Sequence, residues 1–176
     1  MVEGKGFAFS EAGSLVEVDG QFEIIFSKYV NNKSFVLEGW AGMPFSIVAD
    51  YYAEYDAMVL SGQIAAEGVE FSDGSIANIY FVGVGSDGKL YAQGEFATIM
   101  ADANGAVAIS AYAEEGFAIE QLTFIGEFED GLYYVTDFIP GGNLTMTRLE
   151  APAAAPAGGQ AIKIVTMKEK AQDEKE

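Results

Sequence analysis

Apolar and polar positions alternate with a period of two along most of the chain. The clearest examples are residues 76–84, which are rich in β-branched and aromatic side chains, and residues 132–139. Alternation of this period is typical of strands that bury one face, and β-branched and aromatic residues favour the extended backbone. No segment shows a sustained helical stripe. The pattern therefore predicts an all-β protein.

Pairs of Asp or Asn with Gly interrupt this alternation at five points. Such pairs favour positive φ angles and tight hairpins whose twist matches that of the flanking strands. The pairs are Asp19-Gly20, Asp73-Gly74, Asp87-Gly88, Asn104-Gly105 and Asp130-Gly131. With the alternation, they predict strands near residues 5–10, 14–19, 21–28, 34–40, 45–53, 57–60, 76–84, 89–100, 105–113, 117–127, 132–139 and 143–149.

Many short antiparallel strands joined by tight turns must bury one face against each other. A meander that closes into a barrel does this and also hides its edge strands. Small residues such as Gly39, Gly83 and Gly94 permit the sharp bends that a barrel wall requires. We therefore expect an antiparallel meander closing into a calycin-like barrel, with a β-sandwich as the alternative.

The chain of 176 residues has the length of one ordinary domain with a tail. We expect the β-barrel domain to span residues 1–150. Residues 151–160 contain two prolines, two glycines and no large apolar side chain, which predicts a linker. Residues 161–176 are expected to form an extra strand followed by a charged tail. That strand either returns to the edge of the sheet or begins a further domain.

Three short segments follow one another in a recognisable order. A strand ends in Gly39-Trp40, a proline and an apolar strand follow at residues 44–48, and a further strand ends in Gly62-Gln63. In this order and spacing the chain resembles the calycin-like (lipocalin-like) β-barrel domains of Bacteroidales surface and secreted proteins, over roughly residues 21–149. The resemblance implies an extracellular or outer-membrane-surface location. Any signal peptide or lipid anchor is then expected to lie outside these residues.

Composition narrows the chemistry considerably. The chain has no histidine and no cysteine, which excludes a Ser-His-Asp triad, a cysteine nucleophile, zinc sites of the usual kind and disulfides. The net charge is −18, and all of it falls on residues 1–150 because the charges after Glu150 cancel. Such a charge repels nucleic acid and anionic membranes. No stretch approaches the roughly 20 apolar residues that a membrane span requires.

Acidic residues occur close together at several points, among them Asp50, Glu54 and Asp56, and Glu127, Glu129 and Asp130. A glycosidase needs two carboxyl groups flanking one bond, but an acidic chain offers such pairs by chance. Calcium is the one metal whose oxygen ligands this composition supplies, yet the spacing of an EF-hand loop is not present. We therefore interpret the carboxylates as solvated charges, and predict no metal site, no cofactor and no catalytic residues.

Aromatic residues are the best functional candidates. Tyrosine and tryptophan combine a flat apolar face with a polar edge, which suits sugar rings and partner side chains. The candidate ligand-binding residues are Trp40, Tyr51, Tyr52, Tyr55, Tyr112, Tyr133 and Tyr134. Adjacent residues of a strand point to opposite faces, so one member of each Tyr-Tyr pair is expected in the core and the other at the surface or a cavity. For Trp40, at the end of a predicted strand, we expect a place in the core and not at the mouth of a cavity.

These observations predict a non-enzymatic, extracellular or cell-surface domain that binds a ligand or mediates adhesion. Its partner is expected to be a glycan, a lipid or a protein at the cell surface. The alternative is a structural spacer within a larger surface protein, and a weaker one is a carbohydrate-active enzyme. An open, lined cavity of roughly 300 Å³ or more favours binding, whereas an interior filled by Phe, Ile and Val side chains favours the spacer.

Overall fold

The computed structural model describes residues 1–30, 33–101, 104, 106–114 and 117–149. The predicted linker, extra strand and charged tail (151–160 and 161–176) lie outside these residues. Within them the prediction of an all-β protein is confirmed, with a single short 3-10 turn, η1 (Trp40–Gly42). The strands are β1 (Val2–Phe9), β2 (Leu15–Phe22), β3 (Ile25–Val30), β4 (Ser34–Glu38), β5 (Ser46–Tyr52), β6 (Ala57–Ser61), β7 (Gln63–Glu70), β8 (Ile76–Gly85), β9 (Leu90–Tyr91), β10 (Glu95–Ala101), β11 (Val107–Ala111), β12 (Ala113–Glu114), β13 (Phe117–Phe128), β14 (Gly131–Tyr134) and β15 (Phe138–Met146).

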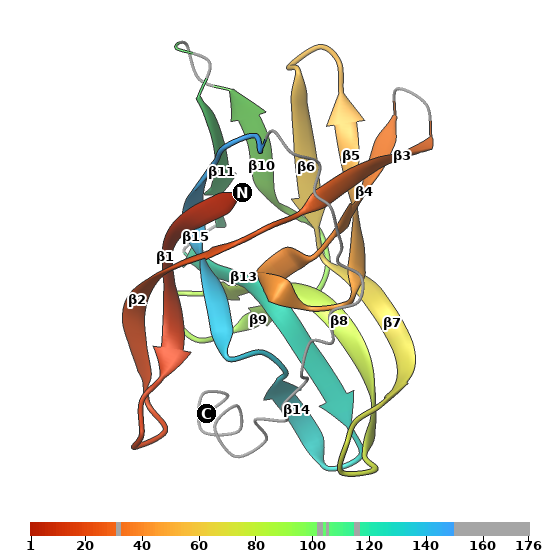
Figure 1. The fold of residues 1–176 in the computed structure, drawn as a ribbon, viewed down its shortest axis with the longest axis vertical. Coiled ribbons are helices and arrows are strands. Elements are labelled where there is room, and N and C mark those ends of the chain that lie inside the picture. The colour runs from red at the N-terminus through yellow and green to blue at the C-terminus, as the bar shows by residue number, and fades with distance from the viewer. Residues whose placement is uncertain (31–32, 102–103, 105, 115–116, 150–176) are drawn as a thin grey trace.

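The strands form one antiparallel hydrogen-bonded sheet with many branches (Figure 1). Its main path runs β3-β4-β5-β6-β10-β11-β15-β13-β8-β7. The order departs from a simple meander, because β6 pairs with β10 and β13 pairs with β8. The path ends at β3 and β7, and backbone hydrogen bonds between described residues do not join these two strands. The sheet is therefore not closed into a barrel by hydrogen bonds, and the β-sandwich alternative is compatible with it.

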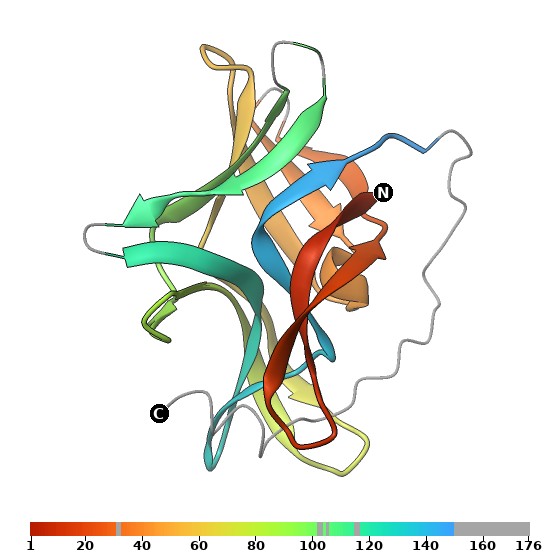
Figure 2. The same ribbon diagram turned by 90° about the vertical axis from the view of Figure 1, so that its left-hand side faces the viewer.

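Strand β15 connects the two halves of the sheet. Strand β1 pairs with it along one side, while β11 and β13 pair with successive parts of its other side (Figure 2). Just beyond β15, the Met1 amino group donates a hydrogen bond to the Thr147 carbonyl oxygen at 2.8 Å. The Thr147 amide donates to the Met1 carbonyl oxygen at 2.7 Å. The first residues of the chain are thus held to the end of β15.

A side chain joins the sheet where β6 gives way to β7. Strand β6 pairs with β5 and β10, whereas β7 pairs with β8, so the sheet divides at this bend. The Gln63 amide oxygen accepts a hydrogen bond from the Val48 amide at 2.8 Å, and its nitrogen donates to the Val48 carbonyl oxygen at 2.9 Å. One glutamine thereby replaces a pair of backbone groups and ties β7 to β5.

Aromatic rings fill the interior between the two parts of the sheet. The side chains of Trp40, Phe81, Phe96 and Phe124 are at most 1% exposed. Phe81 is central, with ring centroids 5.4 Å from Trp40, 5.8 Å from Phe96 and 5.6 Å from Phe124. The Trp40 indole nitrogen donates to the Leu122 carbonyl oxygen at 2.9 Å, so the buried polar edge of the ring is satisfied.

Asp19-Gly20 was predicted to form a hairpin turn, and this prediction is wrong. Both residues lie inside β2, where Asp19 is opposite Lys5 and Gly20 is opposite Gly4 of β1. A Cβ atom on Gly20 would lie 2.5 Å from the Phe138 ring. The glycine therefore makes room for a ring that packs on the strand. Strand β2 pairs with β1 and not with β3, which pairs with β4 instead.

The other Asp-Gly pairs do connect paired strands: Asp73-Gly74 joins β7 to β8, Asp87-Gly88 joins β8 to β9, and Asp130-Gly131 joins β13 to β14. The first shows the expected turn chemistry. Gly74 has a φ angle of +88°, and the Asp73 carboxylate accepts hydrogen bonds from the Ser75 amide at 2.9 Å and the Ser75 hydroxyl at 2.6 Å. Gly105, the second residue of the Asn-Gly pair, lies outside the described residues.

Several predicted strand boundaries are also wrong. Strand β7 was not predicted, since its small residues and Gly68 weaken the alternation. The strand predicted at 89–100 divides into β9 and β10, and that at 105–113 into β11 and β12. The strands predicted at 132–139 and 143–149 are replaced by β14 and β15. Strand β15 runs through Pro140, which lies where the β1–β15 register shifts and a missing backbone donor is tolerated.

Candidate functional site

Three of the seven candidate aromatic residues belong to the core. Trp40 is fully buried, and the side chains of Tyr133 and Tyr134 are only 4% and 2% exposed. The expectation that one member of each tyrosine pair would be at the surface is wrong here, because side chains cover both faces of β14. Tyr133 packs against Phe128 with ring centroids 5.7 Å apart, and Tyr134 packs against Phe9 at 6.0 Å.

Tyr51 and Tyr55 lie at the β5–β6 hairpin, where Tyr52 also ends β5. The Tyr51 hydroxyl donates to the Asp56 carboxylate at 2.8 Å, and its ring meets Phe35 edge to face at 6.2 Å. The hydrogen bond to Asp56 raises the pKa of Tyr51 because it stabilises the neutral phenol. Tyr55 is in the turn itself and is 68% exposed. Neither residue is buried, and the Tyr55 amide donates to the Tyr52 carbonyl oxygen at 3.1 Å.

Tyr52 and Tyr112 do come together, and both lie near Glu95. The Tyr52 hydroxyl donates to the Glu95 carboxylate at 3.0 Å, across 43 residues of sequence. Tyr112 follows β11, and its amide donates to the Phe96 carbonyl oxygen at 2.8 Å, which holds it beside the start of β10. The pKa of Tyr112 is raised, first by partial burial and then by the charge of Glu95. We refer to Tyr52, Glu95 and Tyr112 as the tyrosine cluster.

Strand register explains why Tyr52 points away from the core. Ala49, Leu60 and Ala97 are opposite one another in β5, β6 and β10, and all are fully buried. Side chains alternate between faces along a strand, so Asp50 and Tyr52 lie on the face opposite Ala49. Asp50 is exposed and adds to the negative charge that raises the pKa of Tyr52, although the hydrogen bond to Glu95 is the largest cause.

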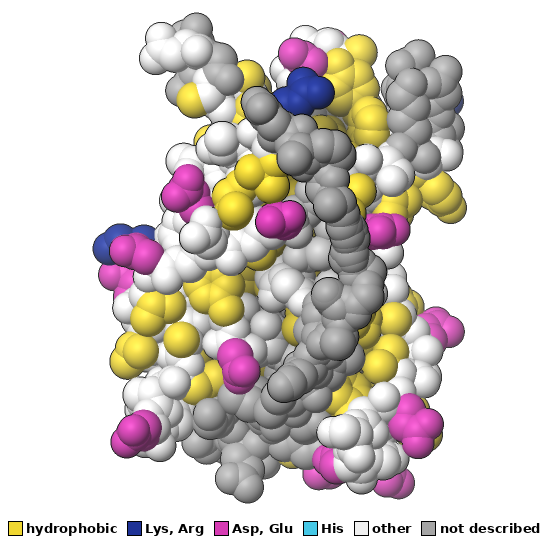
Figure 3. Space-filling view, viewed as in Figure 1, with side chains coloured by type: hydrophobic (Ala, Val, Ile, Leu, Met, Phe, Trp, Pro, Cys, Tyr) yellow, Lys and Arg dark blue, Asp and Glu magenta, His cyan; other side chains and the backbone are white. Residues whose placement is uncertain are grey.

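The described carboxylates lie at the surface and not in a cluster that could hold a metal ion. Every Asp and Glu whose side chain the structure describes is exposed, as the interpretation of solvated charges expects. On the face shown in Figure 3 the acidic side chains are scattered over the surface, with few basic ones among them. Lys5 and Glu17 form an exposed ion pair at 3.3 Å. Within the described ranges, no three Asp or Glu residues are placed to hold a metal ion together.

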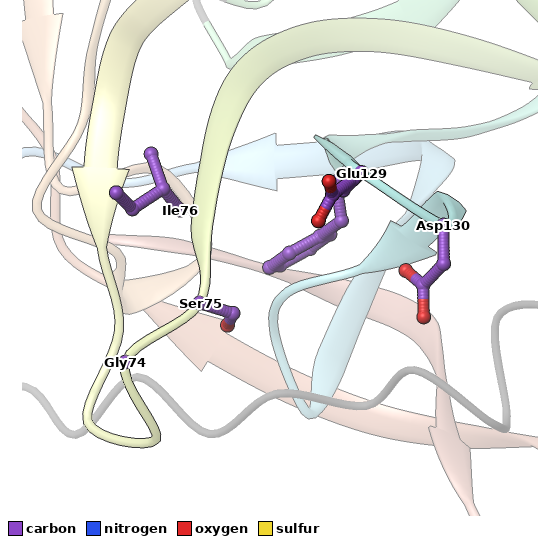
Figure 4. Close-up of a pocket in the computed structure, with 6 residues that line it drawn as sticks. Gly74, Ser75, Ile76, Glu129 and Asp130 are labelled. Atoms are coloured by element: carbon purple, nitrogen blue, oxygen red, sulfur yellow. The ribbon is translucent and has the colours of Figure 1, made fainter.

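A pocket of about 440 Å³ opens between the β7–β8 turn and the β13–β14 turn. Figure 4 shows the Glu129 and Asp130 carboxylates on one side of it and Ser75 on the other. The complete lining is Gly74, Ser75, Ile76, Phe128, Glu129 and Asp130, which we call the turn pocket. Sequence reasoning missed it, because only the pairing of β8 with β13 brings the two turns side by side.

Comparison with protein-family models, with curated proteins and with solved structures finds no match to the chain. The similarity to calycin-like domains therefore stays a prediction. As to membranes, the part of the chain that the structure describes contains no helix with the length and apolar character needed to cross a bilayer.

Proposed function

We propose that the chain is a non-enzymatic, extracellular or cell-surface module that binds a glycan on the tyrosine cluster. The observation that carries this proposal is that Tyr52, whose side chain points away from the core, and Tyr112 lie close to the same exposed carboxylate, Glu95. The location outside the cell rests on the resemblance described above. The weaker enzymatic alternative needs two carboxyl groups that flank one bond, one of them with a raised pKa, and the exposure of every described Asp and Glu side chain supports a binding role over it.

The chemistry of the cluster suits a sugar. A pyranose presents an apolar C–H face, which packs on a tyrosine ring, and hydroxyl groups that donate hydrogen bonds to a carboxylate. Glu95 is exposed and already accepts one hydrogen bond from Tyr52, so its carboxylate is oriented while lone pairs remain for a ligand. A lipid surface is a poorer partner, because the anionic headgroups of many membranes are repelled by a net charge of −18.

A glycan array probed with the full chain tests the proposal. We expect binding to a subset of glycans that weakens at least tenfold in Tyr52→Ala and in Tyr112→Ala. Tyr29→Ala is the matched control, because Tyr29 lies in β3 and is 64% exposed. Circular dichroism of each variant establishes that the fold is retained. Binding that survives both cluster substitutions, or no binding to any glycan, would contradict the proposal.

The spacer function is the second candidate, and the packed interior favours it. The rings around Phe81 occupy the space in which a barrel would otherwise hold a small molecule. A spacer needs no ligand, so it predicts no binding in the glycan array, to vesicles or to proteins of the same cell surface. Its distinctive prediction is that deletion of this domain from its parent protein shortens the reach of neighbouring domains without changing what they bind.

A further inference from the structure

We propose that the turn pocket binds an arginine or lysine side chain of a partner protein. This site is separate from the tyrosine cluster and does not depend on the function proposed for that cluster. The pocket is formed by two hairpin turns that β8 and β13 hold in register, with Asn78 opposite Glu127 at the base. Its volume of about 440 Å³ falls within the range of about 300–1,000 Å³ that is usual for small ligands.

The walls of the turn pocket combine apolar surface with negative charge. Ile76 is 59% exposed although it is a large apolar residue, and it lines one wall. Phe128 also lines the pocket and is supported from behind by Phe71, with ring centroids 5.2 Å apart, and by Tyr133 at 5.7 Å. An arginine or lysine side chain matches this surface, since its methylene groups pack on apolar atoms and its charged end reaches a carboxylate.

Two carboxylates in the turn pocket favour a positively charged ligand. Glu129 and Asp130 are exposed, and neither forms an ion pair with a lysine or arginine in the part of the chain that is described. A guanidinium group binds carboxylates through paired hydrogen bonds, and the phenyl ring of Phe128 attracts a nearby cation. The charge of −18 on residues 1–150 also draws cationic partners toward this surface.

Other ligand classes fit the turn pocket less well. Calcium takes six to eight oxygen ligands, and the pocket is lined by only two carboxylates and one serine hydroxyl. Anions are repelled by both carboxylates. A neutral apolar ligand would remove the carboxylates from water without giving them a partner, which costs free energy. Of the ligand classes compared, a basic side chain is thus the one that packs on the apolar wall and also pairs with the carboxylates.

The test is a titration of the full chain with N-acetyl-arginine amide and N-acetyl-lysine amide, followed by amide NMR. We expect saturable shifts for the amides of Gly74, Ser75, Glu129 and Asp130, and weaker binding at higher salt because the attraction is electrostatic. N-acetyl-citrulline amide is a neutral analogue of nearly the same shape, and we expect at least tenfold weaker binding of it to the unaltered protein. This comparison needs no variant and is therefore independent of folding.

A charge-matched pair of variants completes the test. Glu129→Gln with Asp130→Asn is expected to weaken binding of the arginine probe at least tenfold. The control, Glu23→Gln with Glu54→Gln, removes the same charge from exposed positions elsewhere and is expected to retain most of the affinity. The proposal is overturned if neither cationic probe shifts these amides, if citrulline binds as well as arginine, or if both double variants lose affinity equally.

Discussion

The two Tyr-Tyr pairs of this protein have the same sequence and opposite surroundings. Tyr51 and Tyr52 end β5, and each hydroxyl donates to an exposed carboxylate, Asp56 or Glu95. Tyr133 and Tyr134 end β14, and both rings are buried. The difference arises from what covers each strand. Both faces of β14 meet other side chains, whereas at the end of β5 neither the Tyr51 nor the Tyr52 side chain is buried.

The comparison shows that strand alternation fixes which face a side chain takes, but not whether that face is solvated. Alternation does hold in both pairs, since neighbouring tyrosines take opposite faces. Burial depends on strands distant in the sequence. Phe9 of β1, far from β14 along the chain, covers Tyr134. A binding function can accordingly be sought at Tyr52, while the pair in β14 contributes to stability.

The largest expected contrast between the pairs is in stability. Tyr133→Ala removes a buried ring that packs on Phe128, and we expect a loss of about 3–5 kcal/mol in the free energy of unfolding. Tyr51→Ala removes a partly exposed ring and one exposed hydrogen bond, for which we expect a much smaller loss. Urea denaturation followed by circular dichroism measures both. Equal losses would show that the two pairs do not differ in the way described.

A smaller contrast concerns the hydroxyl groups alone. The Tyr134 hydroxyl donates to the Gln121 side-chain oxygen at 3.3 Å, and both residues are buried. Tyr134→Phe leaves a polar group of Gln121 buried without this donor, so we expect a loss of about 1–2 kcal/mol. In Tyr52→Phe the exposed Glu95 carboxylate can replace the lost hydrogen bond with one to water, so we expect a smaller change. Thermal unfolding of the two variants under one buffer condition is the measurement, and a greater loss in Tyr52→Phe would refute the comparison.

Much of the fold follows from local sequence patterns. The all-β class, the central strands β5, β6, β8 and β13, and the turn at Asp73-Gly74 were predictable from alternation and turn chemistry. The strand position of Asp19-Gly20 was not predictable, because Gly20 makes room for the ring of Phe138, which lies more than a hundred residues away in the chain. An Asp-Gly pair can therefore form a hairpin turn, or it can lie within a strand where another side chain packs closely on the glycine. The local sequence does not distinguish these two cases.

The candidate site was predictable only in part. Tyrosine chemistry singled out Tyr52 and Tyr112, but Glu95 carries no local signal that links it to a residue 43 positions earlier. The turn pocket depends in the same way on the register of β8 with β13. Residue types could thus be chosen from the sequence, while the groupings that give them a function required long-range strand pairing, which alternation alone does not specify.

The smallest expected effect is the titration of Tyr52. Its pKa is raised above the ordinary value of 10.0, because the neutral hydroxyl donates to Glu95 and the negative charge disfavours the phenolate. The folded pKa is the higher one, so this contact stabilises the protein fully below about pH 10, and the contribution is lost as the pH rises through the raised pKa. Ring carbon NMR of the tyrosines measures this pKa directly. Glu95→Gln is expected to lower it toward 10.0, whereas Asp56→Asn is expected to lower the pKa of Tyr51 and leave that of Tyr52 in place. If both tyrosines responded equally to either substitution, the general negative charge of the protein, and not the individual hydrogen bonds, would account for the shifts.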